Sequence, residues 1–376
     1  MPQNRQFFID WIRVLAFGIL IFYHSGMFFV SWDWHVKNNV IVESLKYPMV
    51  FFSQWRLSLL FFISGVGMSF ALKSRKGSAF IGERTKRLLL PLIFGMFVIV
   101  PPQIYFERLQ NHQLLGSYID FYPQFFEFVA YPKGSFSWHH LWFVTYLFVY
   151  SLVGTPIFLA LKSASGQQFL VKFYQTFLHP INIYLTAIPF MVLFWILDPI
   201  SPTTHNLTHD WLNLINSFLV VLMGYVLGQN PKFWEMVETH RKGYLWASIL
   251  FTTSIYLFVF KPIFPIQNED LDFFIKGIIT RINALSIIFC IGGYAKHYLN
   301  VNNKALKYAN EAVYPFYILH QTITVAIGFY IANWEMAWQL KLLILSLGTF
   351  LGSLLIYHFL IRPFNIMRLF FGVKPR

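Results

Sequence analysis

Long apolar runs recur along the chain and are separated by short polar segments. The first run, residues 8–30, reads FIDWIRVLAFGILIFYHSGMFFV. A bilayer core about 30 Å thick needs roughly 20 mostly apolar residues per helix, and by this measure the sequence predicts about ten membrane-spanning helices. The predicted spans are 8–30, 50–72, 88–106, 140–161, 180–197, 212–229, 243–260, 273–294, 312–332 and 341–361.

The first apolar run is typical of a retained helix. A cleavable signal peptide has a short apolar region that ends at small residues. Residues 8–30 are longer than such a region, contain Arg13, and are not followed by a site of that kind. We therefore expect the first transmembrane helix here.

Composition supports the same class of protein. The chain has 376 residues, of which 56% are hydrophobic and only 12% charged, and its mean hydropathy is +0.53. The charged fraction is about half that of a typical soluble domain, which excludes a soluble fold. We predict an all-α polytopic membrane protein that forms a single domain over residues 1–376. One cysteine, Cys290, excludes an intrachain disulfide.

The net charge of +13 is explained by membrane topology. With a cytoplasmic N-terminus, nineteen Lys and Arg residues, Arg5 among them, fall in inner segments and only six fall in outer loops. This bias follows the positive-inside rule. It predicts that both termini are cytoplasmic and that the basic residues contact lipid headgroups, and it gives no reason to expect a nucleic-acid partner.

Arg13 and His24 are polar residues within the first predicted span. A separation of eleven residues places them on one helix face, roughly 16 Å apart along the axis. Charged groups in a membrane helix usually mark function, and this face offers a cation near the inner surface and a titratable base deeper in. The alternatives are an interfacial arginine paired with Asp10 and a histidine hydrogen-bonded to a neighbouring helix.

Arg84 and Arg87 lie in the basic segment KSRKGSAFIGERTKRLLLP, residues 73–91. A spacing of three residues at the start of the third predicted span would place both guanidinium groups on one face. Arginine forks suit phosphate oxygens, and a helix N-terminus favours anions. A phosphate-bearing cytosolic donor could bind here, although an ordinary positive-inside loop would have the same composition.

Histidines also occur at two later places. His139 and His140 adjoin Trp142 in SWHHLWF, where an aromatic and imidazole cluster could bind a sugar and where the alternative is an interfacial aromatic belt. Glu311 and His320 lie in NEAVYPFYILHQT, with Glu311 expected at the inner end of the ninth span. Nine residues place these two on opposite helix faces, so they need not serve one site. The alternatives are a Glu311–lysine pair and a histidine bonded to a carbonyl.

These motifs in order resemble the integral-membrane acyltransferase-3 family. The first span carries R-x10-H, at Arg13 and His24, and the third carries R-x-x-R, at Arg84 and Arg87. FFISG at 61–65, HLWF at 140–143 and YPFYILHQ at 314–321 follow. The opening FIDWIRV…FYH…WHV is most similar to the glucan biosynthesis protein C branch, which is associated with succinylation of glucans. The resemblance extends from residue 7 to about 360.

The resemblance implies an O-acyltransferase of a bacterial inner or cell membrane. It implies acyl-CoA, as acetyl-CoA or succinyl-CoA, as the donor co-substrate and a glycan or other hydroxylated acceptor at the outer face. His24 would be the catalytic histidine, and Arg13, Arg84 and Arg87 would bind the phosphates of the donor. His320 could orient His24 or polarise the thioester, while His140, Trp142 and Glu311 could contribute to acceptor binding. No metal is expected.

Two other classes of protein fit the polar residues within the spans. A transporter or flippase would use them as a proton or substrate path, and a non-catalytic scaffold would use them only to fix helix packing. Coenzyme A binding separates the first alternative from the enzyme. A chemical defect in a folded His24→Ala protein separates the second.

Overall fold

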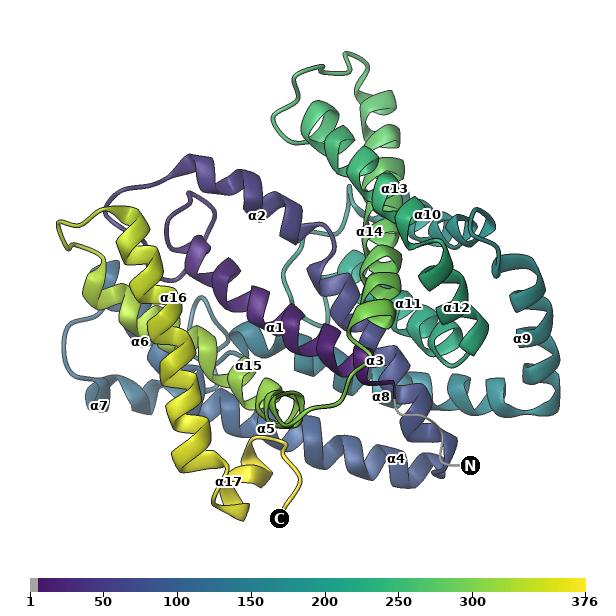
Figure 1. The fold of residues 1–376 in the computed structure, drawn as a ribbon. Coiled ribbons are helices and arrows are strands. Elements are labelled where there is room, and N and C mark those ends of the chain that lie inside the picture. The colour runs from purple at the N-terminus through teal and green to yellow at the C-terminus, as the bar shows by residue number, and fades with distance from the viewer. Residues whose placement is uncertain (1–5) are drawn as a thin grey trace. The chain divides into compact units, whose positions relative to one another are not determined.

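The computed structural model describes residues 6–376, and this part of the chain is helical without β-strands (Figure 1). Arg5, counted above among the inner basic residues, lies outside the described residues. The helices gather into two compact units, each made of three separate segments. Unit 1 comprises Met1–Ala16, Val50–Ile81 and Val149–Asn303, and unit 2 comprises Phe17–Met49, Gly82–Phe148 and Lys304–Arg376. Four helices continue across the boundary: α1 (Phe7–Met27), α2 (Lys46–Ser53), α4 (Gly77–Arg84) and α8 (Trp142–Lys162).

Each of the remaining helices lies entirely within unit 1 or unit 2. Unit 1 contains α3 (Arg56–Lys73), α9 (Ala164–Phe177), η6 (Asn182–Ala187), α10 (Ile188–Leu197), α11 (Trp211–Gly228), α12 (Pro231–Thr239), α13 (Arg241–Ser254), η7 (Ile255–Val259) and α14 (Glu269–Tyr298). Unit 2 contains η1 (Glu43–Leu45), η2 (Thr85–Leu89), α5 (Leu90–Phe94), η3 (Gly95–Ile99), α6 (Pro101–Gln110), α7 (Tyr118–Phe121), η4 (Tyr122–Glu127), η5 (His139–Leu141), α15 (Lys304–Ile331), α16 (Trp338–Leu355), η8 (Ile356–Ile361) and α17 (Asn365–Phe370).

The predicted fold class is confirmed, with eight helices in the described part long and apolar enough to cross a membrane. A ninth is added if the pair Ala164–Phe177 and Asn182–Leu197, bent by 119°, forms one span. The sequence predicted about ten. The predicted span 243–260 is helical as α13 and η7 but is less apolar than these helices.

Two helices begin eight or more residues earlier than predicted. The third apolar helix starts at Gly77 and continues to Gln110, and α15 starts at Lys304. Helix formation does not stop where hydropathy falls, because Ala, Lys, Glu and Arg are good helix formers in water. Arg84 is therefore the eighth residue of its helix, and the argument from a helix N-terminus does not apply to it, because that field falls off within the first turn. Glu311 is likewise inside α15 and not at its end.

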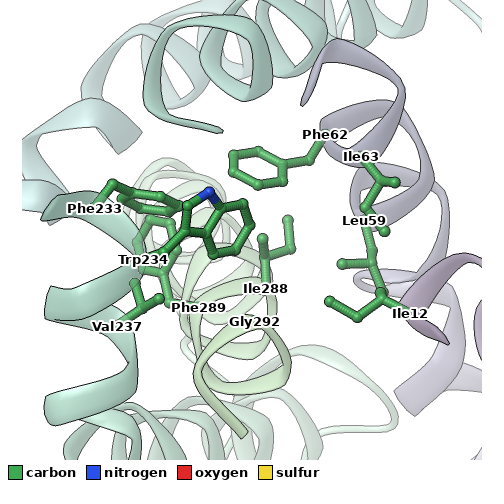
Figure 2. Close-up of a pocket in the computed structure, with 10 residues that line it drawn as sticks. All are labelled: Ile12, Leu59, Phe62, Ile63, Phe233, Trp234, Val237, Ile288, Phe289 and Gly292. Carbon is green, nitrogen blue, oxygen red and sulfur yellow. The ribbon is translucent and has the colours of Figure 1, made fainter. Parts of the chain in front are cut away.

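Unit 1 contains a close backbone contact between α3 and α11. A Cβ atom added at Gly65 would lie 2.0 Å from the carbonyl oxygen of Val221, and one added at Gly224 would lie 2.0 Å from that of Phe62. Gly224 and Gly228 form a G-x-x-x-G sequence, and small residues at this spacing let membrane helices approach closely. The same unit contains a small apolar cavity (Figure 2), lined by Ile12, Leu59, Phe62, Ile63, Phe233, Trp234, Val237, Ile288, Phe289 and Gly292.

In unit 2, α15 packs beside α16, and the segment after α1 is fixed against this pair (Figure 1). Phe28, Phe29 and Val36 are buried in one apolar cluster with residues of α15 and α16. Lys341 is 1% exposed, and its ammonium group donates to Asn38 Oδ1 (2.8 Å) and to the Ala332 carbonyl (2.9 Å). These contacts hold the segment that carries Trp34 and His35.

Candidate functional site

His24 and His320 meet directly within unit 2. His24 lies on the last turn of α1 and His320 in the middle of α15. His24 Nδ1 is 2.7 Å from His320 Nε2, and the two rings are nearly parallel, with 4.9 Å between their centroids. His320 is 1% exposed, whereas His24 is only partly buried. The pair therefore combines one fixed imidazole with one that remains partly accessible.

The partners of His320 determine the direction of this hydrogen bond. His320 Nδ1 lies 2.6 Å from the carbonyl oxygen of Tyr317, which can only accept. His320 Nδ1 must therefore carry a proton, and in the neutral ring Nε2 accepts from His24 Nδ1–H. A neutral His24 then has its lone pair on Nε2. This is the arrangement of a general base whose second nitrogen is oriented by a partner.

His140 and Tyr317 surround the pair. The His140 ring lies edge-on to His320, with 5.4 Å between centroids, and His140 Nε2 donates to the Ile318 carbonyl at 3.0 Å. The Tyr317 hydroxyl donates to the carbonyl oxygen of His140. Two hydrogen bonds thus join η5 to the turn of α15 that precedes His320, and His140 is a neighbour of the histidine pair.

A second polar cluster in unit 2 contains His35, Glu107, Tyr131 and His139. His35 Nδ1 donates to Glu107 Oε2, and the Tyr131 hydroxyl donates to Glu107 Oε1 at 2.5 Å. The rings of His35 and His139 are stacked, with 4.6 Å between centroids and 15° between planes. We refer to these four residues as the His35 cluster.

Glutamine side chains connect the two groups of histidines. Gln321 Nε2 lies 3.0 Å from both His35 Nε2 and Gln103 Oε1. Gln103 Nε2 lies 3.3 Å from His140 Nδ1. The Trp34 ring adds a second link, because its centroid is 5.0 Å from that of His24 and 5.1 Å from that of His35.

The other predicted site residues have different neighbours. Trp142 is buried against Phe143 and Tyr146. Glu311 Oε1 accepts from the Tyr357 hydroxyl at 2.7 Å and from Arg368 Nη1 at 3.0 Å. These contacts give Glu311 a structural ion pair close to the alternative considered from the sequence, with an arginine in place of a lysine.

The three arginines are divided between the units. Arg13, in unit 1, pairs with Asp10 Oδ1 at 3.2 Å, as its alternative interpretation predicted. Arg84 ends α4 and Arg87 lies in the π-helical turn η2, both in the unit 2 part of the chain. The Arg87 side chain is 44% exposed, and Nη1 lies 3.5 Å from Glu83 Oε1. Arg87 is therefore accessible to a soluble anion.

Comparison with known families decides the class of protein. The model of an acyltransferase domain, that of the acyltransferase-3 family, matches residues 6–358. The chain belongs to the acyltransferase-3 family. No curated protein and no solved structure gives a significant match. Family membership supports a membrane acyltransferase in general. The matched region includes every residue of the His24–His320 pair and of the His35 cluster.

Sequence reasoning identified some of these residues and missed others. His24 and His320 are identified because imidazoles are unusual within apolar spans, and His140 because it adjoins Trp142 in SWHHLWF. The sequence assigns no role to His35 and Glu107, because they follow the first and third predicted spans. The sequence did contain one indication of His35: Trp34 and His35 belong to the WHV part of the motif that resembles the family.

Proposed function

We propose that this acyltransferase-3 protein transfers a short acyl group, acetyl or succinyl, from cytosolic acyl-CoA to a hydroxyl group of a glycan or related acceptor at the outer face. The observation that carries the proposal is the 2.7 Å contact between His24 and His320, which leaves the lone pair of neutral His24 on Nε2. The similarity of its motifs to the glucan biosynthesis protein C branch favours succinyl transfer to a glucan. The membrane would be a bacterial inner or cell membrane, with both termini cytoplasmic.

In the proposed reaction His24 Nε2 removes the proton from the acceptor hydroxyl. The oxygen then attacks the thioester carbonyl carbon, the C–S bond breaks, and the departing CoA thiolate receives the proton from His24. His320 accepts from His24 Nδ1–H throughout and stabilises the imidazolium ion. A second route has the acyl group transferred first to His24 and then to the acceptor. Acylated His24 would be detected by mass spectrometry of protein incubated with donor alone only in this second route.

The donor would be held by arginines and the acceptor by residues beside the histidine pair. Arg13, Arg84 and Arg87 supply positive charge for the phosphates of coenzyme A. Among the residues predicted to bind acceptor, His140 has support from its contact with His320. Trp142 and Glu311 have less support, because their observed partners are a buried aromatic group and Arg368.

Donor binding provides the test of this function. Purified protein in nanodiscs is titrated with coenzyme A, acetyl-CoA and succinyl-CoA by calorimetry. We expect binding by the wild type and by His24→Ala, and binding at least 10-fold weaker in Arg84→Ala/Arg87→Ala. The double variant Arg75→Ala/Lys76→Ala removes the same charge from the same basic segment and should bind normally.

Two results would contradict the proposal. Absence of coenzyme A binding by folded wild type would favour the transporter, which has no reason to bind this nucleotide. Equal weakening in both double variants would show that total positive charge, and not Arg84 with Arg87, attracts the donor.

A further inference from the structure

The His35 cluster has the composition of a metal site. One ligand atom from each of His35, Glu107 and His139 can be chosen so that all three lie within 4.8 Å of one another. Two imidazoles and one carboxylate form a common ligand set for zinc and similar divalent ions. The three residues come from the segment after α1, from α6 and from η5, and all belong to unit 2.

His139 provides an independent observation. Its Nε2 atom is buried, and within residues 6–376 no group forms a hydrogen bond with it. A buried polar atom without a partner destabilises the folded state. His139 also has a positive φ of 40°, which is uncommon for a residue with a side chain. The backbone thus holds a strained residue whose ring has one buried nitrogen without a hydrogen-bond partner in the described part of the chain.

The surroundings of these residues match those of metal ligands. His139 Nδ1 lies 2.8 Å from Ser137 Oγ, which can accept its proton and leave Nε2 for a cation. Glu107 already accepts from Tyr131. Metal-bound histidines usually donate their other ring nitrogen to such a partner, and metal-bound carboxylates are likewise hydrogen-bonded.

We propose that His35, Glu107 and His139 bind one divalent transition-metal ion of the zinc type. The ion is coordinated by His139 Nε2, the Glu107 carboxylate and His35 Nδ1. The proton that His35 Nδ1 now donates to Glu107 moves to Nε2 of the same ring, so His35 stays neutral. Ligand atoms around one such ion lie roughly 3–4 Å apart, and one ligand atom of each residue already lies within 4.8 Å of the other two. Gln321 turns its amide so that its oxygen accepts from His35 Nε2–H.

This proposal departs from the expectation of no metal drawn from the sequence. Because the three ligands come from segments more than 30 residues apart, the ion would tie these segments together. It would also fix His35, which contacts Trp34 at the edge of the His24 pair. The role proposed for the ion is structural, so binding can be tested without an acceptor.

The test uses full-length protein without a polyhistidine tag, stripped with a chelator and titrated with Co²⁺ and then Zn²⁺. We expect one Co²⁺ per chain, with visible ligand-field bands of a four- or five-coordinate ion, and displacement by Zn²⁺ with a melting temperature several degrees higher. His139→Ala and Glu107→Gln should each weaken binding at least 100-fold. Glu107→Gln keeps the size of the side chain, so it tests ligand chemistry even if His139→Ala folds poorly.

His209→Ala, which removes an exposed histidine from another loop, is the matched control and should bind normally. The proposal is wrong if folded wild type binds no ion at micromolar concentrations. It is also wrong if Glu107→Gln binds as well as wild type, or if His209→Ala loses binding. None of these readouts involves acyl-CoA, so failure here is distinct from failure of the proposed acyltransferase reaction.

Discussion

At the scale of single residues, the tautomer of His24 depends on a carbonyl group. The Tyr317 carbonyl accepts from His320 Nδ1, and His320 Nε2 can then only accept from His24. The proposed base is therefore oriented by His320 and the Tyr317 carbonyl of α15, and not by a carboxylate. An imidazole held in one tautomer keeps the same nitrogen free of a proton, so that this nitrogen can act as the base.

Replacement of His320 tests this relation. We expect His320→Ala to lower kcat for acyl transfer by about 100-fold, at the low end of general-base contributions, and to leave the KM for acyl-CoA unchanged. His320→Gln retains an acceptor and should recover part of the rate.

A purely structural role for His320 would give a different result. The variants would then lose thermal stability and donor binding together, and His320→Gln would recover none of the lost rate. His209→Ala serves as the control, because it removes a histidine without touching α15.

At the scale of elements, glycine contacts set the distance between α3 and α11. We expect Gly224→Val to destabilise the protein by about 1–3 kcal/mol, because the added atoms meet the Phe62 carbonyl and overpack the contact. Thermal unfolding in detergent measures the change. Gly18→Ala is the matched control, since a Cβ atom added there meets nothing within 4 Å. Equal effects of the two substitutions would contradict the role of close packing.

An ion pair between α12 and the end of α14 predicts a pH dependence. Burial raises the pKa of Glu238, but hydrogen bonds from Lys296 (3.0 Å) and His297 (3.1 Å) outweigh it and leave the pKa below its usual value. A lowered carboxyl pKa stabilises the fold above the unfolded value of about 4.3, and the contribution disappears as pH falls through the folded pKa. Stability should therefore fall more steeply below pH 5 in wild type than in Glu238→Gln. Identical slopes would contradict the assignment.

Hydropathy predicted most elements, because a membrane helix must satisfy its own backbone and reach across the bilayer. It misplaced the starts of the helices at Gly77 and Lys304, because the polar residues there form helix outside the apolar part of the bilayer. For the site, imidazoles in apolar runs identified His24 and His320, whereas His35 and Glu107 could not be paired from sequence. They are 72 residues apart, and only the folded chain brings a loop and α6 together.

At the scale of the whole molecule, the family and the apolar helices agree on a membrane acyltransferase. The acyltransferase domain matches residues 6–358, and eight or nine helices can cross a membrane. Each unit is built from three separate segments of the chain. The histidine pair joins α1 to α15, so it forms only when both helices have folded. A truncation within α15 should therefore abolish transfer even where membrane insertion continues, as measured by transfer assays on inserted protein.

The central claim is that His24 activates a hydroxyl group for attack on acyl-CoA. The most direct measurement is release of free coenzyme A from succinyl-CoA and acetyl-CoA by protein in liposomes, with and without a glycan extract as acceptor. The account predicts extract-dependent release by wild type and at least 100-fold slower release by His24→Ala, with donor binding unchanged. Release by His24→Ala within about 3-fold of wild type would contradict the account.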